Sequence, residues 1–269
     1  MVPREFRPLD DSRFFILGGI SMKDAEEQFI KYTDSYRKYG EKIILKINHT
    51  MRVEKLCEEI ARSLNLKEDD INLAAMCGLL HDIGRFEQWK KYQTYNDLKS
   101  IDHGDLGEKL LKENHLINRF TNNQVNTVLR AVKYHNKYRV PKTISERNKL
   151  FVDITRDADK IDILYLFVKG ELYTKTEESK MSDEIIHALK EKRLIRKDET
   201  KTKADEIAIR LAFLFDINFK KSYDIILEND YINKMIDIQI EESNNKELKE
   251  QLEELRAYLN QYIGEMIKC

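Results

Sequence analysis

The sequence predicts an all-α protein, a helical bundle with additional helices at its C-terminal end. Only nine glycines and three prolines occur among 269 residues, so long helices can run without a breaker. Apolar residues recur at spacings of three and four over several stretches, which is the period of a helix with one buried face. The length suits one large core with an appendage.

Helical spacing is clearest in the first two thirds of the chain. It predicts helices over residues 42–64, 71–83, 103–114, 122–138 and 147–168. Gly84 can end the second of these, because glycine accepts the left-handed conformation common at helix ends. Asn122 or Asn123 can cap the fourth, and Pro141 blocks its continuation. Residues 85–100, which include several Tyr and Asn, predict a loop across the mouth of a site.

Beyond residue 170 the pattern changes. Residues 171–203 are charged and poorly periodic, which predicts an exposed excursion or a linker, and helices resume over 204–217 and 222–240. The tail carries apolar residues at alternating steps of four and three: Leu248, Leu252, Leu255, Leu259, Tyr262 and Met266. This seam predicts either an intramolecular cap or a homodimer contact, and its short length favours the cap.

These patterns divide the chain into four parts. They are a lead-in segment, a main helical core, a charged excursion or linker, and C-terminal helices that cap the core or form a dimer contact, over residues 1–41, 42–170, 171–203 and 204–269.

Composition narrows the class of protein. The 47 basic and 48 acidic residues give a net charge of -1, so no large nucleic-acid surface is expected. Cys57, Cys77 and Cys269 are odd in number and show no CxxC spacing, which predicts buried thiols in a reducing compartment. The apolar run FFILGGI, residues 14–20, is far shorter than the roughly 20 residues of a spanning helix. We therefore expect a soluble, cytoplasmic protein with no membrane partner.

Histidines and aspartates form an ordered series along the core. The series is His49, His81, Asp82, His103, His135 and Asp159. Imidazole nitrogens and carboxylate oxygens are ligands of divalent transition metals such as Mn, Fe, Co, Ni or Zn. The other two histidines, His115 and His187, are assigned to surface or helix-end roles.

Helical spacing turns three members of this series toward the core. His49, His135 and Asp159 each share a helix face with apolar residues. A single inward histidine is more often a hydrogen-bonded core residue than a metal ligand. A buried carboxylate, however, costs several kcal/mol unless it is paired or on a metal. The joint pattern therefore favours a metal site.

The motifs around these residues resemble those of a known superfamily. The pair His81–Asp82 in LLHDIGR, the upstream His49 in NHTMRV and the distal Asp159 in RDADKID resemble the HD-domain metal-dependent phosphohydrolases over roughly residues 42–170. His103 in DHGDLG and His135 in KYHNKY resemble the two extra histidines of its binuclear branch, which includes cyclic-dinucleotide phosphodiesterases.

The resemblance implies an HD-domain core with two metal ions per chain. The first ion is then held by His49, His81, Asp82 and Asp159, and the second by His103 and His135, with Asp82 bridging both. The chain departs from the family in two respects. The GYP signature of one phosphodiesterase group is absent, and Arg85 stands where a lysine commonly follows HDIG.

The activity implied is hydrolysis of a phosphate ester or anhydride, of a nucleotide or cyclic nucleotide, by a metal-activated water. Asp82 and Arg85 are the expected catalytic residues. Arg85 and Lys160 are the expected substrate-binding residues. The guanidinium of Arg85 can donate two parallel hydrogen bonds to a phosphate. A plain surface charge is the alternative for Arg85. The expected partner is a small phosphorylated substrate.

Two further expectations concern the residues around the metals. Asp105 and Asp162 can hold ligand imidazoles in the correct tautomer. The aromatic residues Trp89, Tyr92 and Tyr95 can either stack on a base or serve only in packing.

Two other functions stay open: a mixed-valent diiron oxygenase of the same superfamily, and a non-catalytic sensor or partner-binding module. Iron content and oxygen-dependent turnover would identify the oxygenase.

Overall fold

The prediction of an all-α protein is confirmed. The computed structural model describes residues 22–113, 117, 121–172 and 179–268, and these residues form helices and no strand. The first part of the chain contains α1 (Met22–Asp34), η1 (Arg37–Tyr39), α2 (Glu41–Ser63), α3 (Glu68–Leu80), α4 (Ile83–Tyr92), η2 (Asp97–Lys99), α5 (His103–Glu113) and α6 (Asn122–Tyr134). We call α1–α6 the N-terminal lobe.

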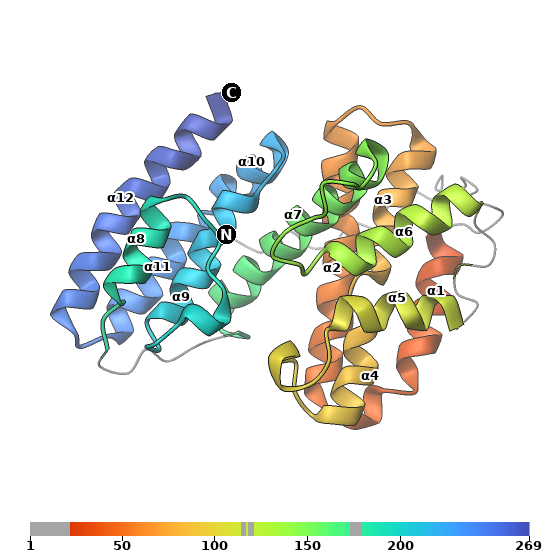
Figure 1. Ribbon diagram of the computed structural model, residues 1–269, viewed down its shortest axis with the longest axis horizontal. Helices are drawn as coiled ribbons and strands as arrows, with labels where there is room; N and C mark the ends of the chain where they lie inside the picture. The colour runs from red at the N-terminus through yellow and green to blue at the C-terminus, as the bar shows by residue number, and fades with distance from the viewer. Residues whose placement is uncertain (1–21, 114–116, 118–120, 173–178, 269) are drawn as a thin grey trace, which may run out of the picture.

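The last part of the chain forms a second group of helices. They are α8 (Asp183–Lys190), η3 (Lys197–Glu199), α9 (Asp205–Leu211), η4 (Ala212–Asp216), α10 (Lys220–Glu228), α11 (Tyr231–Glu242) and α12 (Lys246–Lys268). We call this group the C-terminal lobe. Between the lobes runs α7 (Glu146–Val168), which packs on α2, α3 and α6 at one side and on α9, α10 and α11 at the other (Figure 1).

Helix α3 forms the centre of the N-terminal lobe because its residues are apolar on every face and are buried together from Leu73 to Leu80. Gly78 lets it approach α2 closely. A Cβ atom on this residue would lie 2.9 Å from the Cα of Glu54, so any side chain would push the two helices apart. The close approach brings the middle of α2 next to the C-terminal end of α3, where His49 and His81 lie.

Two expectations for residues 71–100 are wrong. Helix α3 ends at Leu80, before His81, and Gly84 lies inside the next helix rather than ending the previous one. A Cβ on Gly84 would lie 2.2 Å from the carbonyl oxygen of His103, so this glycine serves the packing of α4 on α5. Residues 85–92, expected in a loop, belong to α4, whose buried residues include Phe86 and Gln88.

Helix α6 begins at Asn122, as expected, but ends earlier than expected. Its cap is Thr121, whose hydroxyl accepts from the N–H of Gln124 in a capping box, rather than Asn122 or Asn123. The helix ends at Tyr134, before the expected Tyr138. A buried guanidinium explains the early end: Arg156 Nη1 donates to the carbonyl oxygens of Tyr134, His135 and Lys137, at 2.9, 3.0 and 2.6 Å. These carbonyls need no further turn of helix to be satisfied.

The excursion expected over residues 171–203 is structured in its described part. Residues 183–190 form α8, with Ile185 and Leu189 buried, so the prediction of an exposed segment is wrong there. The carboxylate of Asp205 accepts hydrogen bonds from the backbone N–H groups of Ser182, Lys201 and Thr202. It therefore fastens both ends of the segment to the start of α9.

The C-terminal helices differ from the expectation at one point. The helix predicted over residues 222–240 is two helices, α10 and α11, separated at Asp230, whose φ of 54° a continuous helix does not allow. The leucines of the heptad seam are buried by α10 and α11 of the same chain. The seam is thus an intramolecular contact. At the other end of the chain, residues 22–34 of the expected lead-in segment form α1, which buries Phe29 in the core.

Candidate metal centre

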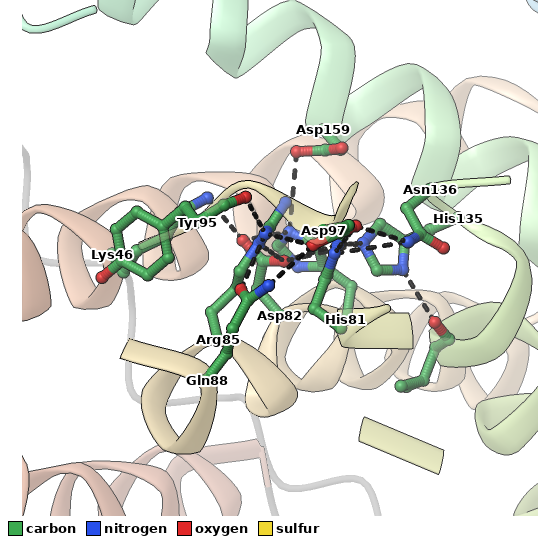
Figure 2. A network of polar contacts seen from close by, with 12 residues as sticks. Lys46, His81, Asp82, Arg85, Gln88, Tyr95, Asp97, His135, Asn136 and Asp159 are labelled. Carbon is green, nitrogen blue, oxygen red and sulfur yellow. Dashed lines mark hydrogen bonds and ion pairs between the residues drawn. The ribbon is translucent and has the colours of Figure 1, made fainter. Parts of the chain in front are cut away.

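The structure brings together all six residues of the His/Asp series. They come from five places along the chain, either inside a helix or at a helix end. His49 lies in the middle of α2, His81 and Asp82 between α3 and α4, His103 at the first residue of α5, His135 just after α6 and Asp159 in the middle of α7. Figure 2 shows His81, Asp82, His135 and Asp159 converging. All except Asp159 are at most 3% exposed.

The carboxylate of Asp82 lies between two pairs of imidazoles. Its Oδ2 lies 3.5 Å from Nε2 of both His49 and His81. Its Oδ1 lies 3.3 Å from Nε2 of His103 and 3.6 Å from Nε2 of His135. One carboxylate thus presents one oxygen to each pair.

Asp159 lies closest to the first pair, although one of its oxygens is also within 4.8 Å of a ring nitrogen of His135. Its Oδ1 lies 3.2 Å from Nε2 of His49 and 3.6 Å from Nε2 of His81. The first half of the centre therefore has two imidazoles and two carboxylates, and the second half has two imidazoles and one carboxylate oxygen.

Hydrogen bonds hold the outer nitrogen of each imidazole. His81 Nδ1 lies 2.7 Å from the carbonyl oxygen of Gly78, and His135 Nδ1 lies 2.8 Å from that of Val132. A carbonyl only accepts, so both rings carry their proton on Nδ1. His49 Nδ1 and His103 Nδ1 face carboxylates instead, Asp162 at 2.7 Å and Asp97 at 2.6 Å. All four rings consequently turn Nε2 toward the centre.

This arrangement fits divalent cations. The Nε2 atoms of His49 and His81 are 3.3 Å apart, and those of His103 and His135 are 2.9 Å apart. When the rings are neutral in the tautomer that the outer hydrogen bonds favour, each pair of Nε2 atoms presents two lone pairs to the same point. A cation between such atoms satisfies both. Burial opposes a charge on His49, but hydrogen bonds to Asp159, Asp162 and Asp82 raise its pKa to about 10, so a cation that binds here displaces a proton. Imidazole with carboxylate suits Mn, Fe, Co, Ni or Zn.

The carboxylates give the centre a negative potential. Burial alone would raise the pKa of Asp82, but Lys46 and the neighbouring histidines hold it well below its usual range. Burial likewise opposes ionisation of Asp159, yet hydrogen bonds from His49 and His81 keep its pKa well below the ordinary value. Both carboxylates are therefore ionised at neutral pH, as metal binding requires.

Two cationic side chains border the centre. Lys46, one turn before His49 on α2, places its Nζ 2.6 Å from Asp82 Oδ2. Arg85 uses Nη1 to donate to Gln88, to the carbonyl oxygen of Tyr95 and to Asp97. Its Nε is buried without a hydrogen-bond partner among the described residues, 3.5 Å from Asp82 Oδ1. Arg85 could be predicted from the sequence, whereas Lys46 could not, because only its spacing of three from His49 marks it.

Lys160 follows Asp159 on α7 but has a different electrostatic environment. Its Nζ contacts Asp216 Oδ2 at 2.7 Å, and the same oxygen accepts from Arg156 Nη2 at 2.5 Å. Burial, together with the neighbouring Arg156, lowers the pKa of Lys160. This residue is therefore already paired with a carboxylate of the C-terminal lobe.

Of the two carboxylates expected to orient the imidazoles, one does so. Asp162 contacts His49 and is itself held by Arg52 at 2.6 Å. The prediction for Asp105 is wrong, because its side chain is 51% exposed and pairs with Lys133 and Lys137 at the surface. Asp97 occupies the corresponding place beside His103. It lies in the segment after α4, and no periodicity points from there to His103.

The aromatic residues of this segment form a packing cluster. Trp89 stacks at 4.8 Å on Tyr95 and donates from Nε1 to the carbonyl oxygen of Tyr39. Tyr95 in turn donates from its hydroxyl to the carbonyl oxygen of Lys42. Trp89 and Tyr95 therefore serve in packing, whereas Tyr92 is 38% exposed and lies outside this cluster. None of the three is among the described residues that line the cavity.

The metal centre opens into a cavity of about 580 Å³ between the two lobes. Its walls include residues of the centre and its borders, together with further residues from α7, α9, η4 and the segment 194–198. Those of the centre and its borders are Lys46, Asp82, Arg85, Asp97, His103, His135, Asp159 and Lys160. A cavity of this size is in the range of small-molecule sites.

The remaining residues singled out in the sequence lie elsewhere. His187 is on the surface of α8, with a side chain 74% exposed, as expected. His115 and Cys269 lie outside the described residues, as does the apolar run over 14–20. Cys57 and Cys77 are buried free thiols. Within the part of the chain that the structure describes, no helix is long and apolar enough to cross a membrane.

Comparison with known families agrees with this geometry. The model of the HD domain family matches residues 47–164, which include all six residues of the centre. This part of the chain therefore resembles an HD domain, the domain of a superfamily that includes metal-dependent hydrolases. Comparisons with curated proteins and with solved structures found no match.

Proposed function

We propose that this protein is a metal-dependent phosphohydrolase with two divalent metal ions per chain. One observation supports the proposal above the others: Asp82 turns Oδ2 toward His49 and His81, and Oδ1 toward His103 and His135. A carboxylate in this position can hold two ions side by side, with Asp159 completing the ligands of the first.

Ions held in this way supply a nucleophilic water at neutral pH and stabilise negative charge on a phosphoryl oxygen. The chain's own residues do the rest. Asp162 and Asp97 hold His49 and His103 in the tautomer that turns Nε2 inward. The substrate is a phosphate ester or anhydride, for which a nucleotide is our first candidate.

Two cations at the edge of the centre suit the phosphate. Lys46 Nζ lies on Asp82 Oδ2, the oxygen that a metal would share, so a bound metal leaves this ammonium free to pair with a phosphate oxygen. Arg85 keeps a buried Nε that lies 3.5 Å from Asp82 Oδ1 and makes no hydrogen bond among the described residues, while Nη1 is fixed by the segment after α4. Arg85 is thus held in place with a donor to spare.

The first test is metal stoichiometry. Protein purified without chelator and saturated with Mn²⁺ should bind two ions per chain, measured by elemental analysis and calorimetry. His49→Ala should lose mainly one ion and His135→Ala mainly the other. Saturation at one ion per chain would contradict the binuclear assignment.

The second test is activity. The loaded protein should release phosphate from at least one member of a panel of nucleotides, cyclic dinucleotides and phosphomonoesters. Asp82→Asn should abolish the release, because the amide carries no charge to offset two cations, while circular dichroism stays unchanged. His187→Ala, at an exposed position outside the centre, is the matched control and should keep full activity. Oxygen uptake by iron-loaded protein, with no phosphate release, would instead identify an oxygenase.

A further inference from the structure

The cavity beside the metal centre has an apolar wall that the proposed phosphate chemistry does not use. It is formed by Ile163, Leu194, Ile209 and Phe213, and we call these four residues the apolar wall. Each is only half-buried and exposes apolar surface into the cavity. Three of the four come from the C-terminal lobe or the segment leading to it.

The apolar wall begins close to the metal centre. Ile163 follows Asp159 by four residues on α7, so both lie on one face of this helix, about 6 Å apart along its axis. Ile209 and Phe213 are likewise four residues apart on α9 and η4. The ring of Phe213 lies 5.9 Å from Lys160 Nζ. A molecule with its phosphate at the centre therefore has its organic part within reach of the wall.

Polar contacts hold the apolar wall in place. The hydroxyl of Tyr138 donates to the carbonyl oxygen of Leu194 at 3.2 Å. Asp216, at the end of η4, binds both Arg156 and Lys160 of α7. These contacts tie the segment 194–198 and η4 to the helices that carry the metal centre, so the wall is preformed.

The cavity is also much larger than a phosphate. Its volume of about 580 Å³ equals the space of roughly 20 water molecules in the liquid. Inorganic phosphate has five heavy atoms and would fill only a small part. An apolar surface left in water is unfavourable, whereas a flat organic group placed on it is stabilised by burial and ring stacking.

We propose that the site selects phosphate esters whose alcohol part is a bulky, ring-bearing organic group, seated on Phe213 and Ile209. This inference rests on the proposed function, because it assumes that the metal centre holds the phosphate. The C-terminal lobe then determines specificity, and small esters such as glycerol phosphate are poor ligands.

Binding of two phosphonates tests the inference without hydrolysis. Metal-loaded protein is titrated by calorimetry with benzylphosphonate and with methylphosphonate, which share the anion and differ in the ring. Benzylphosphonate should bind more tightly by at least about tenfold, which is about 1.4 kcal/mol. Equal affinities, or binding of neither probe, would overturn the proposal.

Two variants locate the preference. Phe213→Ala and Ile209→Thr should each reduce the ratio of the two affinities to about threefold or less, while leaving the affinity for methylphosphonate within about twofold. Phe215→Ala is the matched control: Phe215 also lies on η4, but packs on Tyr262 at 5.1 Å, outside the cavity lining. It should keep the wild-type ratio.

The outcomes separate the two proposals. A ratio that stays high in both wall variants would mean that the ring binds elsewhere, and the inference would fail. A high ratio that depends on Phe213 or Ile209, in a protein that hydrolyses no phosphate ester, would retain the binding site and overturn the proposed function. Thermal unfolding of each variant shows whether it is folded. If Phe213→Ala does not fold, Ile209→Thr provides the test of the apolar wall.

Discussion

The behaviour of each histidine in the centre depends on the partner of its outer ring nitrogen. Two of the four partners are backbone carbonyls, Gly78 and Val132, three residues before the histidine in each case. These contacts come from local helix geometry and no mutation of a side chain removes them. The other two are the carboxylates of Asp162 and Asp97, which can be tested separately from the metal ligands.

Asp97 should control the second ion. Asp97→Asn removes the carboxylate that fixes His103 Nδ1–H, so the affinity for the second ion should fall by about 10- to 100-fold. The first ion, on His49 and His81, should be affected little. Calorimetric titration with Mn²⁺ measures both steps.

Asp105→Asn is the control for this change. Asp105 lies two residues after His103, but its carboxylate pairs with surface lysines. Metal affinity should therefore be that of the wild type. Equal losses in the Asp97 and Asp105 variants would show that general charge, rather than the contact with His103, controls the affinity.

Residue spacing allowed all six members of the centre to be singled out, because each lies in a short motif or on an apolar helix face. Asp97 and Lys46 were missed for different reasons. Asp97 reaches His103 only through the fold of the segment after α4, which carries no periodicity. Lys46 shares a face with His49, but a lysine at helical spacing is more often solvated than buried beside a carboxylate.

Another buried acid predicts how stability varies with pH. Burial of Glu54, opposed by Lys55 and reinforced by Glu26, raises its pKa from 4.5 to about 8. In the unfolded chain this carboxyl ionises near its ordinary pKa, whereas in the folded chain it keeps its proton until about pH 8. Folding therefore binds a proton between these values, and the stabilisation is full below pH 4.5 and lost as the pH rises toward 8.

Glu54→Gln should remove this dependence. Between about pH 5 and 8 the free energy of unfolding of the wild type should fall relative to that of the variant, by at most about 1.4 kcal/mol per pH unit. Urea titrations across this range provide the measurement. Parallel curves for the two proteins would mean that the folded carboxyl is already ionised at pH 5.

At the scale of helices, glycine positions decide how closely the elements around the centre pack. A Cβ on Gly84 would collide with the carbonyl oxygen of His103, at 2.2 Å. Since His103 is the first residue of α5, a shift of α5 away from α4 would also move this imidazole away from the centre.

Gly84→Ala should therefore destabilise the fold by about 1–3 kcal/mol, as overpacking does, and weaken binding of the second ion. Gly264→Ala on α12 is the control, because nothing lies within 4 Å of a Cβ at that position. It should stabilise by up to about 1 kcal/mol through helix propensity. Thermal unfolding and metal titration of both variants give the comparison, and a harmless Gly84→Ala would contradict the close packing.

Most helices could be predicted from apolar spacing, and the exceptions have physical causes that apolar spacing does not detect. Residues 85–92 were expected in a loop because polar and aromatic residues dominate them. The structure buries Gln88, whose amide donates to Asp97, Ser100 and the carbonyl oxygen of Ile101. A polar residue that is buried by hydrogen bonding is invisible to a pattern that counts apolar residues. The break at Asp230 could not be predicted, because asparagine and aspartate, the residue types at positions 229 and 230, also occur within helices.

At the scale of the whole molecule, the two lobes are joined by charged residues as well as by apolar packing. Asp157 of α7 accepts from the backbone N–H groups of Asn218 and Phe219, ahead of α10. Asp216 holds Arg156 and Lys160. The sequence places these acids and bases more than fifty residues apart, so their pairing, and the cavity it creates, could not be predicted from spacing.

The contact of Asp216 with α7 should contribute strongly to stability. The side chains of Arg156 and Lys160 are only 3% and 8% exposed, and both depend on the same carboxylate oxygen. Asp216→Asn removes the charge from the one carboxylate that both cations contact. Breaking a buried pair in this way costs about 3 kcal/mol.

Asp237→Asn provides the control, because Asp237 also pairs with an arginine, Arg256, at 2.6 Å, but is 55% exposed. Water screens this pair, so the loss should be at most about 1 kcal/mol. Urea unfolding of the two variants measures the difference directly. Equal small losses would mean that the cavity admits enough water to solvate Arg156 and Lys160, and that the C-terminal lobe is joined to α7 mainly by its apolar contacts.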